Sequence, residues 1–397
     1  MNLQHKQNNK GKGVLFYTGL TYFIVLLLFV GLRISFSLID FGDMSDVWKD
    51  RLFTIITQLL IMGAIPLLLI KTLTKQTYKQ TFERFSFKRT SPKTIGYSFI
   101  LGAFVFFLTV IISTFFNGII SFLGYSVDVP PLVVDESPAL YFLLSVLFTA
   151  VLPGFFEEFT HRGMLLGGLE TKGSFLRAIL LSGLMFGLMH LNITQFFYAT
   201  AIGMLLGAVT LITRSIWPAI IVHFTNNFIS VYLSHAKAND WFLGGFYSAI
   251  DGFFAESHFL LVFLASFLVI ALVIVVVFLL VAKLYAERAQ ADFKQFVKRF
   301  RQEMISNGHA EDVDFNNQEL MLSYYRQVEL VKREAEVRLA VEESLANGGM
   351  VKQRKFLGVP ITSKNKGKPT FWENFFFYAS ITLGVIITIF TFVWGMI

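Results

Sequence analysis

Long apolar stretches separated by short polar loops make up most of the chain. Nine runs are long and apolar enough to form helices that cross a bilayer, which takes about 20 mainly apolar residues. They lie at about 14–39, 52–73, 94–123, 139–167, 175–190, 194–212, 216–233, 258–284 and 371–396. The pattern predicts an all-α fold, a polytopic transmembrane helical bundle. The first run is longer than a signal-peptide core and no small-residue cleavage pattern follows it, so we expect a transmembrane helix there.

One long polar stretch interrupts this pattern before the last apolar run. It contains two predicted helices, at about 284–305 and 318–345, rich in Ala, Glu, Lys and Arg and separated by a turn at Asn307-Gly308. We expect a solvated helical hairpin, with a docking site for a protein partner as the alternative. The chain then divides into a leader at 1–13, N-terminal transmembrane helices at 14–135, a transmembrane core at 136–284, the hairpin at 285–370 and a last transmembrane helix at 371–397.

Composition supports a membrane protein. Hydrophobic residues make up 54% of the chain and charged residues 15%, which is far more apolar than a soluble core of this length requires. The absence of cysteine excludes disulfides, thiolate metal sites and a cysteine nucleophile. The net charge of +7 lies mostly in loops, where topology and anionic lipid explain it, so we expect the lipid bilayer and no nucleic acid as a partner.

The distribution of Lys and Arg predicts the orientation. The leader and the loop at 71–93 are basic, whereas the segments at 40–46 and 128–136 are acidic. Basic loops remain in the cytoplasm, so we expect a multi-pass protein of the cell membrane with a cytoplasmic N-terminus. Counting helices forward from that end makes the polar hairpin a cytoplasmic insertion before the last transmembrane helix.

Three short polar signatures lie inside the apolar runs. They are Glu-Glu-Phe-Thr-His-Arg at 157–162, Phe-Gly-Leu-Met-His at 186–190 and His-Phe-Thr-Asn-Asn at 223–227. A charged side chain at bilayer depth costs on the order of 2.5 kcal/mol or more, so polar residues there usually face an interior cavity and serve ion movement or catalysis. A buried polar site is therefore the first hypothesis.

The first signature places two carboxylates in different surroundings. Residues four apart share a helix face, so Glu157 lies over His161 and Glu158 over Arg162. Arg162 can keep Glu158 ionised, whereas Glu157 faces no arginine and is a candidate general base. His161 could modulate Glu157 or act as an alternative ligand. The structural alternative is a helix end from which Glu and Arg reach the membrane interface.

The other two signatures differ in strength. His223 and Asn227 are one helical turn apart and could present two neutral donors to an oxyanion, although an interhelical hydrogen-bond pair is the alternative. Phe186 and His190 also share a face, but a histidine beside an aromatic ring is more often a packed residue than a catalyst. That signature is weak by itself.

Together the three signatures resemble those of the CPBP family, also called the CAAX prenyl protease type II or Abi family. The resemblance covers about 140–233, including the segment at 215–220 that precedes His223. The matching positions are Glu157, Glu158 and Arg162 for EExxxR, Phe186 and His190 for FxxxH, and His223 and Asn227 for HxxxN. Each motif is common, whereas the ordered set is specific.

The resemblance implies an intramembrane endopeptidase with its catalytic core at 136–284. Glu157 would activate a water that His190 orients, while His223 and Asn227 would stabilise the oxyanion. Glu158 and Arg162 would form a supporting ion pair. A carboxylate base with preorganised donors suffices chemically for amide hydrolysis.

The use of a metal stays open at this point. Two histidines and a glutamate also form an open zinc set, here Glu157, His190 and His223, but the HExxH spacing of soluble metalloproteases is missing. The sequence favours a glutamate-dependent site without a cofactor, with a divalent metal such as zinc as the alternative.

The expected substrate is a membrane-associated peptide or protein. If the chain is bacterial, as its lysine-rich leader suggests, peptide maturation or bacteriocin self-immunity is favoured over processing of prenylated CAAX proteins. The rival is a non-catalytic membrane scaffold or bacteriocin-immunity protein that binds a partner. A proton-coupled transporter is third, because Glu and His at membrane depth also form proton relays, but no convincing inverted repeat is found.

Overall fold

The computed structural model separates the chain into two compact units. The first comprises residues 1–287 and 367–397, and the second residues 288–366. The structure describes residues 13–125, 137–172, 174–246, 248–249, 259–309, 311, 313–317, 319–328, 355–356, 359–360 and 369–394. Of the leader predicted at 1–13, only Gly13 lies within these ranges.

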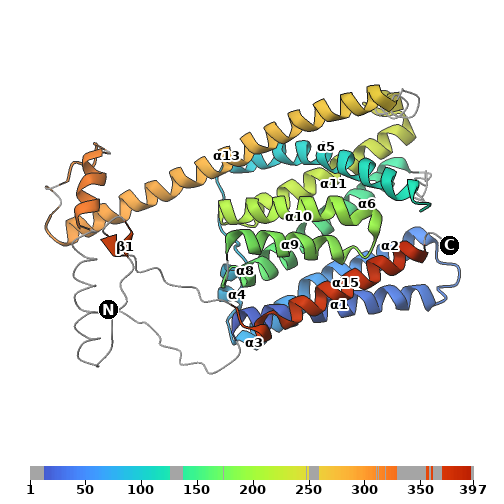
Figure 1. Ribbon diagram of the computed structural model, residues 1–397, viewed down its shortest axis with the longest axis horizontal. Helices are drawn as coiled ribbons and strands as arrows, with labels where there is room; N and C mark the ends of the chain where they lie inside the picture. The colour runs from blue at the N-terminus through green and yellow to red at the C-terminus, as the bar shows by residue number, and fades with distance from the viewer. Residues whose placement is uncertain are drawn as a thin grey trace. The chain divides into compact units, whose positions relative to one another are not determined.

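The first unit is a bundle of helices, as the apolar pattern predicts, and the all-α fold class is confirmed (Figure 1). Its helices in chain order are α1 Val14–Leu38, α2 Asp46–Ile55, η1 Ile56–Ala64, α3 Ile65–Thr74, α4 Tyr78–Arg84, α5 Pro92–Phe122, α6 Pro138–Ser145, η2 Val146–Val151, α7 Leu152–Glu158, η3 Phe159–Leu166, α8 Gly167–Leu169, α9 Phe175–Met189, α10 Ile193–Thr213, α11 Trp217–Asn239, the first part of α13 Phe259–Ser306, and α15 Phe371–Trp394.

Seven helices among the described residues are long and apolar enough to cross a membrane, which makes this a multi-pass membrane protein. Two of the nine predicted runs differ from them. α9 has 15 residues, about 22 Å, and is shorter than the hydrocarbon core of about 30 Å. α11 has 23 residues but carries the polar groups of the third signature, which lower its hydropathy. The short helix α9 and the less apolar helix α11 both contribute residues of the signatures.

Two of the membrane helices contain π-helical turns. η1 lies within the continuous helix Asp46–Thr74, and η2 and η3 lie within Pro138–Leu169. A proline lies two residues after the end of η1 and of η2, at Pro66 and Pro153. Since proline has no N–H, it cannot donate to the carbonyl four residues earlier, and helices adjust locally around it.

These prolines leave two backbone carbonyls without their usual N–H donor, and side chains from other helices donate hydrogen bonds to them instead. Thr160 donates its hydroxyl to the carbonyl of Met62 at 2.5 Å, and Asn227 donates to the carbonyl of Thr149 at 2.9 Å. In a bilayer no bulk water is present to satisfy such groups, so these bonds hold helices together at defined points.

The helices pack through small residues as well as apolar side chains. α10 packs against α9, α11 against α5, and α15 against α1 (Figure 1). A Cβ atom at Gly203 would lie 3.0 Å from the Cα of Gly183, so α9 and α10 approach too closely to accept a side chain there. The last helix is tied to the core by Lys172 and Glu373 at 2.6 Å. α15 is thus an integral part of the bundle.

The helix α13 corrects one predicted boundary. α13 continues without a break across the position near residue 284 where a new helix was expected, because neither Gly nor Pro occurs between Phe259 and Ser306. The predicted turn at Asn307-Gly308 is present, with Gly308 at φ +76°.

The second unit has its own apolar cluster, formed by Phe300, Met304, Val313 and Met321. The second predicted helix is described at 319–328, and its remainder to 345 lies outside the described residues. The sequence did not predict the short antiparallel pair of β1, Lys355–Phe356, with β2, Val359–Pro360.

Candidate active site

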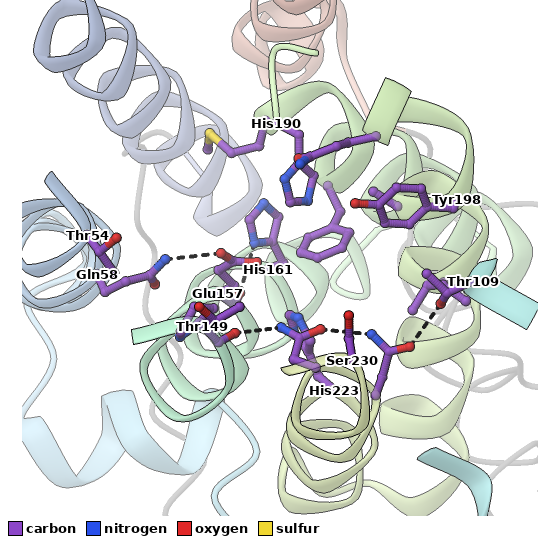
Figure 2. A pocket seen from close by; sticks show the side chains of 18 of the residues that line it. Thr54, Gln58, Thr109, Thr149, Glu157, His161, His190, Tyr198, His223 and Ser230 are labelled. Carbon is purple, nitrogen blue, oxygen red and sulfur yellow. Dashed lines mark hydrogen bonds between the residues drawn. The ribbon is translucent and has the colours of Figure 1, made fainter. Parts of the chain in front are cut away.

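The residues of the three signatures meet at one cavity inside the first unit. It has a volume of about 700 Å³, and Glu157, His190, His223 and Asn227 all line it. They come from α7, from the end of α9 and from α11, and Figure 2 shows the first three with their side chains around the cavity. The structure therefore brings all four predicted catalytic residues together, although they are far apart in the sequence.

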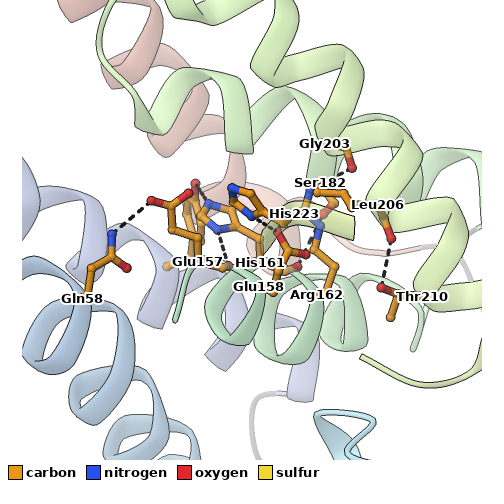
Figure 3. Close-up of polar contacts among 11 residues, drawn as sticks. Gln58, Glu157, Glu158, His161, Arg162, Ser182, Gly203, Leu206, Thr210 and His223 are labelled. Atoms are coloured by element: carbon orange, nitrogen blue, oxygen red, sulfur yellow. Dashed lines mark hydrogen bonds and ion pairs between the residues drawn. The ribbon is translucent and has the colours of Figure 1, made fainter. Parts of the chain in front are cut away.

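Glu157 faces this cavity and is held by an amide. Gln58 in η1 donates from Nε2 to Oε1 of Glu157 at 3.0 Å (Figure 3). Both side chains line the cavity. The partner of this carboxylate is neutral, in agreement with the expectation that no arginine pairs with Glu157.

Glu158 has the opposite surroundings. Its side chain is fully buried, and its Oε1 accepts from Nη1 of Arg162 at 2.8 Å and from Nδ1 of His223 at 2.9 Å. Arg162 is also buried and donates from Nη2 to the carbonyl of Gly203 at 3.0 Å. The predicted Glu158–Arg162 pair is present, and it also holds an imidazole from α11 (Figure 3).

The bond to Glu158 changes the expectation for His223. A carboxylate only accepts, so Nδ1 of His223 carries the proton, and in a neutral ring Nε2 then has a lone pair. In this tautomer a neutral His223 does not donate from Nε2, so its donation to an oxyanion stays a prediction that requires the imidazolium. His223 can donate there only as an imidazolium, while as a neutral ring it accepts.

Asn227 lies in a hydrogen-bonded chain that joins three elements. Thr109 in α5 donates to Oδ1 of Asn226 at 2.9 Å, and Asn226 donates to Oδ1 of Asn227 at 2.8 Å. Asn227 in turn uses one N–H for Thr149 in η2 (Figure 2). The interhelical role considered for Asn227 is thus present, and the carboxamide still has a second N–H beside the cavity.

Phe186 organises the imidazoles of the site. Its ring lies edge-on to His161, His190 and His223, with centroid distances of 4.9, 5.2 and 5.9 Å. The guanidinium of Arg162 lies 4.4 Å from the centroid of the same ring. The second signature, weak when taken alone, therefore supplies the aromatic residue that contacts the other two.

His161 lines the cavity but contacts the main chain of Glu157 rather than its carboxylate. Its Nδ1 donates to the Glu157 carbonyl at 2.8 Å, and its Nε2 lies 3.2 Å from the hydroxyl of Tyr22 in α1. Tyr22 also donates to the carbonyl of Met185 at 2.8 Å. These contacts connect α1, η3 and α9 beside the site.

His190 stands at the end of the short helix α9. The next residue, Leu191, has φ +52°, and its carbonyl accepts from Thr391 of α15 at 3.2 Å. Asn192 caps α10 by accepting from the backbone N–H of Thr194 at 2.9 Å. The turn that presents His190 is therefore stabilised partly by the last helix.

The positions of Glu157, His190 and His223 test the alternative of a metal site. Within the part of the chain that the structure describes, no group of three or more His, Cys, Asp or Glu side chains is placed to hold a metal ion. Glu157, His190 and His223 line the same cavity without forming such a group. The present arrangement of these three side chains does not fit a bound metal ion.

The sequence reasoning missed Gln58, the partner of Glu157. A polar amide inside the apolar run at 52–73 was a usable signal, since such groups at bilayer depth are usually paired or functional. Its partner lies 99 residues away, so the pairing itself required the fold.

Comparison with known proteins agrees with the motifs. Residues 139–229 match the model of the family described as type II CAAX prenyl endopeptidase Rce1-like. This segment runs from α6 into α11 and contains all three signatures. Neither a curated protein nor a solved structure matches the chain.

Proposed function

We propose that the protein is an intramembrane endopeptidase, because residues 139–229 match the model of the type II CAAX prenyl endopeptidase Rce1-like family. It hydrolyses a peptide bond of a membrane-associated peptide or protein by means of a water activated by Glu157. One observation supports this most: of two adjacent carboxylates, Glu158 is sealed in an ion pair, whereas Glu157 faces a cavity beside His190.

In the proposed reaction, Glu157 removes a proton from a water that His190 helps to orient. The water oxygen bonds to the substrate carbonyl carbon, and the carbonyl electron pair moves to its oxygen. Asn227 stabilises this oxyanion with its remaining N–H, and His223 does so as an imidazolium whose Nδ1–H donates to Glu158. The C–N bond then breaks, and the leaving nitrogen takes the proton from Glu157, giving an acid and an amine.

We propose the orientation predicted from the basic loops, with a cytoplasmic N-terminus. Cysteine labelling tests it, because the native chain contains none. A Lys75→Cys variant in intact cells should resist a membrane-impermeant thiol reagent, and labelling from outside would reverse the orientation. The hairpin then faces the cytoplasm, where it could contact a protein partner.

The second candidate is a non-catalytic scaffold, including a bacteriocin-immunity protein. The observation that favours it is that Asn227 takes part in a series of interhelical hydrogen bonds, a structural role that requires no catalysis. A scaffold places no demand on the carboxylate of Glu157 as a base.

The deciding experiment uses purified full-length protein and a peptide library that contains prenylated and unmodified membrane peptides. Cleavage by the wild type that is lost in Glu157→Gln supports the protease. Activity that survives in this variant excludes Glu157 as the base, and a wild type that cleaves no peptide favours the scaffold. Chelator and zinc arms test separately for a metal requirement.

A further inference from the structure

The candidate base is held by a residue outside the family-matched segment. Gln58 lies in η1, is 4% exposed and donates from Nε2 to Glu157 at 3.0 Å. Because an ionised carboxylate accepts and never donates, the amide must turn its nitrogen toward Glu157. The orientation of the Gln58 amide is thus fixed by the carboxylate.

This orientation has an energetic cost. Oε1 of Gln58 is buried and finds no donor among the described residues. A buried acceptor without a partner lowers the stability of the folded protein. The residues that line the cavity beside Gln58 are both polar, as Thr54 and Thr57 are, and apolar, as Phe53 and Met62 are, so this position does not itself require an amide. The amide therefore contributes something other than stability.

The backbone around Gln58 holds η1 against the segment that carries Glu157. The carbonyl of Met62 accepts from Thr160 at 2.5 Å, two residues after Glu158. A Cβ atom at Gly63 would lie 2.8 Å from the ring of Phe156, the residue before Glu157. These two contacts flank the amide–carboxylate pair, so the distance between Gln58 and Glu157 is set by packing.

We propose that Gln58 is a positioning residue for Glu157. Its N–H binds Oε1 and fixes the rotamer of the carboxylate, which leaves the second oxygen for the water. The inference rests on the proposed protease function and extends the site to a helix outside residues 139–229. It predicts that Gln58 matters for turnover and little for stability or substrate affinity.

The test compares Gln58→Met, which keeps the length of the side chain without its amide, with the wild type. We expect kcat to fall about 10- to 100-fold, because a misplaced catalytic group can cost up to about 100-fold. KM should change less than about twofold and Tm should stay equal or rise, since an unpaired buried acceptor is removed. A purely structural residue would instead lower Tm.

Gln76→Met is the matched control. It makes the same substitution at an amide that bonds to Arg84 at 3.2 Å and does not line the cavity, so kcat should be unchanged. Wild-type kcat in Gln58→Met, or a lower Tm with kcat and KM both altered, overturns the inference. If the wild type cleaves nothing, or Glu157→Gln stays active, the proposed function fails and the inference fails with it.

A second arm tests the geometry without activity. Cysteines introduced together at Gln58 and Glu157 should be joined by a short bifunctional thiol reagent, because the native chain contains no competing thiol. The control pair combines Glu157→Cys with Leu60→Cys, since Leu60 is exposed on the same helix and should not be joined. Failure of the first pair to be joined in folded protein overturns the inference, even where the wild type cleaves peptide.

Discussion

Glu157 and Glu158 are neighbours in the chain with opposite environments. Glu158 is fully buried and shares one oxygen between Arg162 and His223, whereas Glu157 faces the cavity and meets the neutral amide of Gln58. Successive residues on a helix point about 100° apart, so one face of this helix serves the bundle and the next serves the cavity. A sealed carboxylate is suited to holding its neighbours, and an open one to moving a proton.

The comparison also explains why both groups are present. A buried ion pair adds little net stability, because desolvating its charges offsets their attraction. Its value here is geometric, since Glu158 fixes which nitrogen of His223 carries the proton. Arg162 at the same time contacts α10 through Gly203 and the ring of Phe186. The sealed carboxylate therefore orients groups that the open one uses.

The largest expected effect separates the two carboxylates by function. Glu157→Gln keeps the size of the side chain and removes the base, so cleavage should fall about 100- to 10,000-fold. Tm in detergent should remain close to that of the wild type, because the carboxylate has no charged partner in its hydrogen bond with Gln58. Rates on the best-cleaved library peptide, with a thermal melt of each sample, provide the measurement.

The same change from Glu to Gln at position 158 should lower the stability of the protein. Glu158→Gln leaves the buried Arg162 without its anion, and breaking a buried pair in this way costs about 3–5 kcal/mol. Denaturation in detergent measures the loss. If Glu158→Gln is as stable as the wild type, the contrast between sealed and open carboxylates is wrong.

A double-mutant cycle with Arg162→Met sharpens this result. Since Glu158 and Arg162 contact each other directly, removal of both should cost less than the sum of the single losses. If the losses of unfolding free energy in the two single variants add up to the loss in the double variant, the two side chains do not interact in the detergent-solubilised protein. The cycle also shows whether His223 alone can compensate for the charge of Glu158.

The helices and the signatures were accessible from the sequence because both are local patterns. Apolar runs give helix positions, and a spacing of four residues places Glu158 over Arg162. The pairing of Gln58 with Glu157 was not accessible, because it joins two helices whose separation is set by Gly63 and Phe156.

The donor and acceptor roles of His223 and Asn227 also could not be predicted from the spacing of residues in the sequence. His223 and Asn227 share a helix face as expected, but the proton on His223 is assigned by Glu158. The bond of Asn227 to Thr149 depends on Pro153, which leaves that carbonyl without its helical donor. In each case a tertiary contact decides what a correctly placed side chain can donate.

An intermediate effect is expected in the hydrogen-bonded chain that supports Asn227. Thr109→Val removes the donor to Asn226 and should cost about 0.6–2 kcal/mol, the range for interhelical bonds in membranes. Cleavage should fall less than in Asn227→Ala, which removes the proposed oxyanion donor itself. Equal losses of activity in both variants would mean that turnover needs the whole series of hydrogen bonds and not Asn227 alone.

The smallest expected effect lies where the last helix meets the site. Thr391 shares its single hydroxyl proton between the carbonyl of Leu191, next to His190, and the carbonyl of Thr388 in its own helix. Thr391→Val should therefore cost about 1 kcal/mol, the net value of a typical hydrogen bond, and should lower kcat a few-fold by loosening the turn that presents His190.

Thr388→Val is the matched control, because its hydroxyl is buried on the same helix and has no partner among the described residues. Its removal should leave Tm equal or higher and kcat unchanged, since replacing an unpaired buried hydroxyl by a methyl group of similar size removes a cost. If the two variants behave alike, α15 supports the bundle without supporting His190. If only Thr391→Val lowers kcat, the open side of the site depends on a helix that lies outside the family-matched segment.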